Sequence, residues 1–116
     1  MALYPVLLLA STQLPNAVAS QGGPTSPTKW LVKRAVFTNT DTAAHTITVH
    51  HVPNGGSPSA GNIVIEVYGL GPQGQPGHTY VAAELTDMIF NSGDTLQCFS
   101  DTANVVNVTV SGFTFQ

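Results

Sequence analysis

Histidine is the side chain of this sequence with the clearest chemical potential, because imidazole binds metals and titrates near neutral pH. Three of the four histidines, His45, His50 and His51, lie close together, and His78 follows further along. Zinc needs three or four converging ligands. In a strand, His50 and His51 point to opposite faces, whereas His45 and His51 share a face but lie about 20 Å apart. We therefore expect surface or interface histidines without a bound metal; a pair near a symmetry axis could make assembly pH-sensitive.

The acidic residues do not show the arrangement of a catalytic pair. Asp41, Asp94 and Asp101 fall in turn sequences, where Asp side chains commonly bond to the nearby backbone. Glu66 and Glu84 fall in predicted strands, on the solvent side of the alternation. Glycosidases need two carboxylates facing each other across a cleft. No such pair is indicated.

The sequence also lacks the pattern of an activated nucleophile. Its single cysteine, Cys98, alternates with apolar neighbours in a predicted strand, as a buried and unreactive thiol would. No G-x-S-x-G sequence is present. The segment Gly69–Gly77 is rich in glycine but has no G-K-[ST] and no following helix, so it predicts a loop rather than a phosphate site. We expect a protein that is not an enzyme and that carries no cofactor.

Aromatic side chains offer one further kind of site. Trp30, Phe37, Tyr68 and Tyr80 could form a platform on which a sugar ring stacks. Such residues more often fill a β core or anchor a protein interface. We take Trp30, Tyr68 and Tyr80 as possible interface aromatics, and a carbohydrate-binding module for a host surface remains an alternative function.

The elements that carry these residues are predicted to be strands. Apolar residues alternate in short runs between turn clusters, and no helical period is sustained. The predicted runs are Tyr4–Leu9, Lys29–Thr38, Ala44–Val52, Asn62–Tyr68, Thr79–Leu85, Thr95–Phe99, Val105–Val110 and Gly112–Gln116. Thr86–Phe90 is predicted as a short turn or 3₁₀ piece. About eight strands at intervals of roughly 8–12 residues predict an antiparallel β-sandwich of jelly-roll type.

The first 28 residues contain no charged side chain. Ala2–Ala10 is apolar, and Ser11–Thr28 is polar and rich in Pro, Gly and Ser. We expect residues 1–28 to form an extended arm and linker, and residues 29–116 to form the sandwich. An arm this apolar is expected to lie against another subunit, so a chain without residues 1–20 should fold but not assemble. The arm residues expected at the partner interface are Leu3, Tyr4, Val6, Leu7, Leu8, Leu9 and Leu14.

Charge is unusually sparse in this chain. Asp, Glu, Lys and Arg make up 8% of the 116 residues, against about 25% in ordinary domains. A surface with so little charge is expected to be covered by neighbours. The three basic residues, Lys29, Lys33 and Arg34, are too few for a nucleic-acid footprint. No apolar run reaches the roughly 20 residues that span a membrane, so neither nucleic acid nor membrane is an expected partner.

The order of turns and strands is similar to that of a known group of proteins. The sequence reads LPNAVAS, then KWLVKRAVFTNTDTAAHTITVHHVPNGG, then NSGDTLQCFSDTANVVNVTVSGFTF. A basic and apolar strand ends in a TNT turn, the next strand ends in VPNGG, a GD turn opens another strand, and V-x-V-x-V-S-G closes the pattern. This pattern resembles the small β-sandwich virion proteins encoded among the structural genes of tailed bacteriophages.

The resemblance covers most of the chain and carries no catalytic residue onto it. It implies a structural virion protein that decorates and cements the capsid, with the major capsid protein or other virion proteins as partners. A homotrimer located in the virion, after assembly in the host cytoplasm, is the expected form. A tail, collar or fibre component of the virion is the alternative within the same resemblance.

Overall fold

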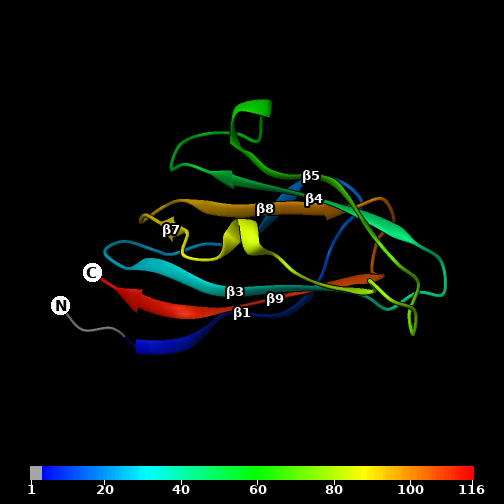
Figure 1. Cartoon of the computed structure of the whole chain (residues 1–116). Helices are drawn as coiled ribbons and strands as arrows, with labels where there is room; N and C mark the ends of the chain where they lie inside the picture. The colour runs from blue at the N-terminus through cyan, green and yellow to red at the C-terminus, as the bar shows by residue number, and fades with distance from the viewer. Residues whose placement is uncertain (1–3) are drawn as a thin grey trace.

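The computed structural model describes residues 4–116, and these fold into strands joined by turns and loops (Figure 1). The strands are β1 (Tyr4–Gln13), β2 (Ala19–Gly22), β3 (Lys29–Asn39), β4 (His45–Val52), β5 (Ile63–Leu70), β6 (Thr79–Val81), β7 (Ile89–Phe90), β8 (Thr95–Ser100) and β9 (Val106–Phe115). Two single 3₁₀ turns, η1 (Ala60–Asn62) and η2 (Ala83–Leu85), lie in the connections. The last two predicted runs are thus one strand, and the predicted turn at Thr86–Phe90 contains β7.

The strands form two antiparallel sheets that pack face to face. Sheet A has the order β1-β9-β3-β6, with β7 also paired to β3, and sheet B has the order β2-β8-β4-β5. The first strand therefore lies beside the last, and the chain crosses repeatedly from one sheet to the other. Figure 1 shows the two layers, with both termini at the same end. This order is that of a jelly roll and confirms the predicted all-β sandwich.

The core lies between the sheets and follows the period of two expected of strands. Val106, Val108 and Val110 share the inner face of β9, and all three are buried. They face inward-pointing residues of sheet B such as Ile47 and Cys98, which have no exposed surface. Alternation in the sequence is therefore sufficient to identify most of this core.

One strand departs from simple alternation. Val32 pairs with Gly112 while Arg34 pairs with Ser111, so β3 carries one extra residue at this point. Such a bulge reverses which residues face the core. Trp30 and Val32 are buried before it, and Ala35 and Phe37 are buried after it. Strict alternation would place Trp30 and Val32 on one face and Ala35 and Phe37 on the other, so alternation fails across this bulge.

The segment expected to be an arm is built into both sheets. β1 pairs with β9 from Tyr4 opposite Thr114 to Gln13 opposite Asn107, and β2 pairs with β8. Leu14 has no exposed surface and belongs to the core. Residues 4–22 thus close the free edges of β9 and β8, which would otherwise expose unpaired backbone groups.

Candidate functional site

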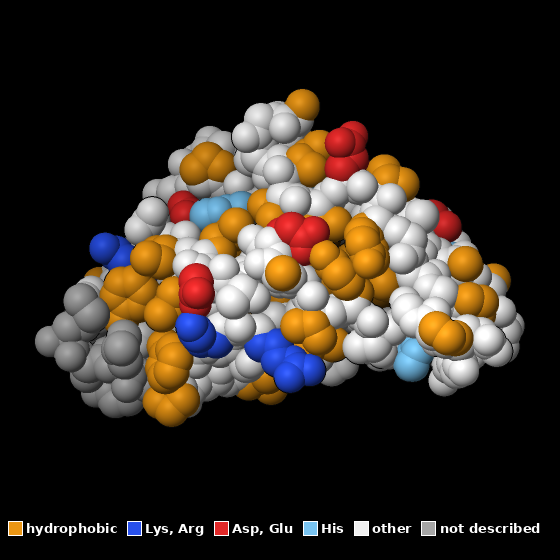
Figure 2. All heavy atoms as spheres, in the orientation of Figure 1, with side chains coloured by type: hydrophobic (Ala, Val, Ile, Leu, Met, Phe, Trp, Pro, Cys, Tyr) orange, Lys and Arg blue, Asp and Glu red, His pale blue; other side chains and the backbone are white. Residues whose placement is uncertain are grey.

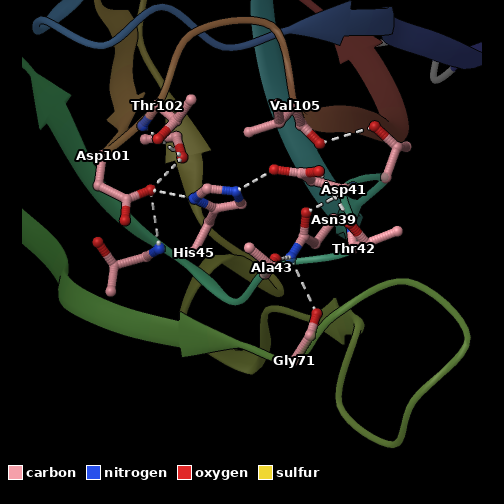
Figure 3. Close-up of polar contacts among 12 residues, drawn as sticks. Asn39, Asp41, Thr42, Ala43, His45, Gly71, Asp101, Thr102 and Val105 are labelled. Carbon is pink, nitrogen blue, oxygen red and sulfur yellow. Dashed lines mark hydrogen bonds and ion pairs between the residues drawn. The ribbon is translucent and has the colours of Figure 1, made fainter.

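The histidines of β4 attach loops to the sandwich. His45 is only 8% exposed, and each of its ring nitrogens faces a carboxylate (Figure 3). Its Nε2 lies 2.7 Å from Asp41 Oδ2, and its Nδ1 lies 2.8 Å from Asp101 Oδ1. Asp41 belongs to the turn between β3 and β4, and Asp101 to the turn between β8 and β9. The ring therefore joins two turns that are distant in sequence.

This geometry favours a charged imidazolium, because only the doubly protonated ring donates from both nitrogens. The hydrogen bond with Asp41, with a further contribution from Asp101, holds the pKa of His45 above its usual value despite the burial of the ring. The same hydrogen bond holds the pKa of Asp41 below its usual value. With both nitrogens engaged, His45 is not placed to act as a free general base.

The stability that His45 contributes is expected to depend on pH. Because its pKa is raised on folding, this contribution is complete below about pH 6.5 and is lost as the pH rises through the folded value. The lowered pKa of Asp41 means that its part is lost as the pH falls below about 4. Urea unfolding across this range should show a smaller difference between His45→Gln and wild type at alkaline than at mildly acidic pH. His78→Gln serves as the control, since His78 faces only the Gln75 carbonyl; an unchanged pH profile in His45→Gln would contradict the assignment.

The other two histidines of β4 have similar structural partners. His50 is 7% exposed, and its Nδ1 lies 2.8 Å from Asn62 Oδ1. His51 Nε2 lies 2.9 Å from Asp94 Oδ2, and its ring lies 4.0 Å from that of Phe90. Burial raises the pKa of Asp94, but hydrogen bonds from His51 and from backbone N–H groups outweigh this and lower it overall. The expectation of surface or interface histidines was therefore wrong for His45 and His50, which are buried within the chain.

Among residues 4–116, no group of three or more His, Cys, Asp or Glu side chains has the geometry of a metal site. The carboxylates around His45 bind its two nitrogens from different sides rather than converging with them on one point. The described histidines thus act through hydrogen bonds to turns, which sequence spacing alone does not reveal.

The thiol of Cys98 is expected to be unreactive in the folded protein. It lies on the inner face of β8 without exposed surface, and burial raises the pKa of its thiol from 9.0 to about 12. Since the thiolate is the reactive form, labelling should be slower by about a thousandfold from ionisation alone. Ellman's reagent should therefore react with the denatured chain but not with the native one. Rapid labelling of the native chain would contradict the burial of this residue.

The predicted interface aromatics separate into two groups. Trp30 is buried and packs beside Phe90, with ring centroids 5.9 Å apart. Tyr68 of β5 and Tyr80 of β6 stack at 4.0 Å, which closes one open side of the sandwich. The Tyr80 hydroxyl donates to Glu84, and this bond together with burial raises the pKa of Tyr80 to about 12. Tyr68 remains 39% exposed.

An apolar row crosses the outer face of sheet A. Pro5 lies opposite Phe113, Phe113 opposite Leu31, and Leu31 opposite Ile89, so all four side chains project from the same face. Ile89 is 48% exposed, and Leu7, one register step away on this face, is 57% exposed. With the partly exposed Phe115, these residues form what we call the sheet A face. Figure 2 shows hydrophobic side chains beside Lys and Arg at the lower left of the view, on the side of sheet A.

The residues predicted to form the arm interface have different locations. Leu14 is in the core, and Leu8 and Leu9 pack against it from β1. Val6 and Leu7 remain exposed, at 39% and 57%. Tyr4 begins β1 opposite Thr114, and Leu3 lies outside the described residues. Of the predicted set, Leu7 is therefore the residue that the structure places on the sheet A face.

The sheet A face could not be found from sequence, because its members come from four strands and meet only through the register. Among the described residues, no helix has the length and apolar character needed to cross a membrane. Comparison with protein-family models, with curated proteins and with solved structures finds no match to this chain.

Proposed function

We propose that this chain is a structural protein of a tailed-phage virion, without enzymatic activity, which decorates the capsid shell and docks through its sheet A face. The observation that carries the proposal is the apolar row Pro5–Phe113–Leu31–Ile89 on the solvent side of a sheet. Interaction sites on soluble proteins are often exposed apolar patches bordered by polar residues. Jelly rolls occur in viral capsid and lectin domains, so the fold is compatible with this role.

The composition supports a docked rather than a free surface. Only 8% of the residues are charged, and hydration of the free monomer depends on Thr, Ser, Asn and Gln. The carboxylates of Asp41 and Asp94 are bound by the rings of His45 and His51, so these two negative charges are engaged in contacts within the chain. Few charges remain to oppose contact with a neighbouring subunit.

The proposed docking surface differs from the extended arm that the sequence predicts. β1 is paired to β9 on one side and forms an edge of sheet A on the other. Such an edge offers unpaired backbone groups that can add a strand from a partner. Pro5 and Leu7 of β1 extend the apolar face to this edge. We expect the capsid contact to combine the sheet A face with pairing along β1.

Co-sedimentation with particles that lack this chain tests the proposal. Wild type should bind saturably and raise the melting temperature of the particles. Ile89→Asp should weaken binding by about tenfold or more, because it places a charge in the apolar contact. Val18→Asp is the matched control, since Val18 is 42% exposed but lies outside the sheet A face. Absence of binding, or equal binding by both variants, would contradict the proposal; binding only to tailed particles would favour the tail, collar or fibre alternative.

A further inference from the structure

We infer that the sheet A face also binds a second copy of this chain, at the edge formed by β5 and η2, in a head-to-tail contact. This inference rests on the proposed function: the second copy occupies the sheet A face of the free chain, and the capsid takes its place there on docking. It is argued from the distribution of charge around the two surfaces.

All three Lys and Arg residues of the chain lie on β3. Lys29 is opposite Phe115, and Arg34 is opposite Ser111, which is itself opposite Leu7. Lys29 and Arg34 therefore lie among the apolar side chains of the sheet A face, while Lys33 pairs with Asp87. Two copies meeting through this same face would bring positive charges together, which costs affinity. The face is suited instead to a surface that is apolar and negative.

A second surface of the same chain, at the open side of the sandwich where β5 lies beside β6, is apolar and negative. Glu66, Val67 and Tyr68 are consecutive exposed residues of β5, and Glu84 of η2 is held beside them through its bond with Tyr80. We call these four residues the β5 edge. In Figure 2, acidic side chains lie next to hydrophobic ones in the middle of the view. The β5 edge therefore combines apolar area with negative charge.

The backbone at the β5 edge is strained. Val67 has φ +45°, which is rare for a β-branched residue, and its N–H donates to Thr48 Oγ1 at 3.2 Å. Ile47 pairs with Tyr68 and Val49 with Ile65, so β5 carries an extra residue here. The bulge leaves Val67 63% exposed, although burial would be the usual place for its side chain. Strain of this kind is found where a site needs the conformation, and here it directs an apolar side chain outward.

A contact between two different surfaces is heterologous, and each copy uses each surface once. Such contacts form a closed ring when the rotation between copies permits, and an open chain when it does not. An isologous dimer through the sheet A face is not expected, because of its positive charges.

Sedimentation velocity of the purified chain, with charge-reversal variants, tests this inference. Arg34 and Glu66 are both exposed, so their reversal is expected to leave the fold intact. Arg34→Glu and Glu66→Arg should each weaken self-association by about tenfold or more, since like charges then face each other. The double variant should recover most of the wild-type affinity, because the pair is restored with opposite orientation. Wild-type association should also weaken in about 0.5 M salt.

Ser20→Arg and Ser20→Glu are the control variants. Ser20 is exposed on β2, at the edge of sheet B away from β5, so these changes alter net charge without touching either surface. They should associate like wild type. A monomeric wild type, single reversals without effect, or a double variant no stronger than the singles would overturn the inference.

The particle-binding assay separates this result from the proposed function. A wild type that stays monomeric but binds particles would refute the self-contact and leave the virion role standing. A wild type that self-associates with charge-swap rescue but ignores particles would refute the virion role and leave the self-contact standing.

Discussion

A chain lacking residues 1–20 is expected not to form the sandwich. The deletion removes all of β1 and half of β2, and with them Leu14 from the core. β9 would lose its partner along one side, and β8 would lose most of its pairing with β2. Circular dichroism and one-dimensional proton NMR should show a chain without dispersed amide signals. A truncated chain that is folded and cooperative would restore the arm interpretation.

A single substitution tests the same point without removing a strand. Leu14→Ala should lower the free energy of unfolding by about 2–5 kcal/mol, because the side chain is fully buried between the sheets. Leu7→Ala is the matched control in the same N-terminal segment, since Leu7 is 57% exposed and surface changes usually stay within about 0.5 kcal/mol. Urea denaturation at low protein concentration measures both. Equal effects would contradict the placement of Leu14 in the core.

Gly112→Ala is expected to destabilise the protein by about 3 kcal/mol or more, at the upper end of what overpacking costs. A Cβ at this position would lie 2.0 Å from the Leu31 carbonyl oxygen and 3.0 Å from the Lys33 nitrogen. These are backbone atoms of β3, so β3 and β9 would have to separate beside the bulge. Because β9 is an inner strand of sheet A, paired to β1 as well as to β3, the displacement would spread to β1.

Gly69→Ala provides the control for this substitution. Gly69 also lies in a strand, but a Cβ there would meet nothing within 4 Å. Its replacement should be neutral or slightly stabilising, since alanine loses less backbone entropy on folding. Thermal and urea unfolding of the two variants give the comparison. A Gly112→Ala chain as stable as Gly69→Ala would show that the sheets tolerate the approach.

The strands that could be predicted are those with clear alternation and strong turn signals. β3, β4 and β8 appear within a residue or two of their predicted ends. Val106, Val108 and Val110 alternate within the predicted run Val105–Val110, and all three are buried on one face of β9. These strands follow from local pattern, since each has one face toward the core.

The errors have a common physical origin in long-range pairing. The run before Leu14 looked like an arm because its apolar residues had no visible partner in sequence. Their partner is β9, at the other end of the chain. Gly112 was placed at the start of a new run, whereas it lies inside β9, where β3 approaches closely. Bulges in β3 and β5 also change which residues face outward, and local propensity does not predict them.

The contacts of the candidate site also depend on residues that are far apart in sequence. The sequence drew attention to the histidines, but it could not show that Asp41 and Asp101 meet at His45 from separate turns. It gave Tyr68 and Tyr80 as aromatics of interest without indicating that they stack. The sheet A face depends on the register of β1, β9, β3 and β7, and so becomes visible only in the folded chain.

A difference map between cryo-EM reconstructions of virions with and without this chain tests the proposed function most directly. We predict jelly-roll density on the outer capsid shell, with the sheet A face buried against neighbouring subunits. Density confined to the tail, collar or fibres would replace the capsid role by that alternative. Virions that show no difference density, from a preparation in which the chain is expressed, would contradict the structural role itself.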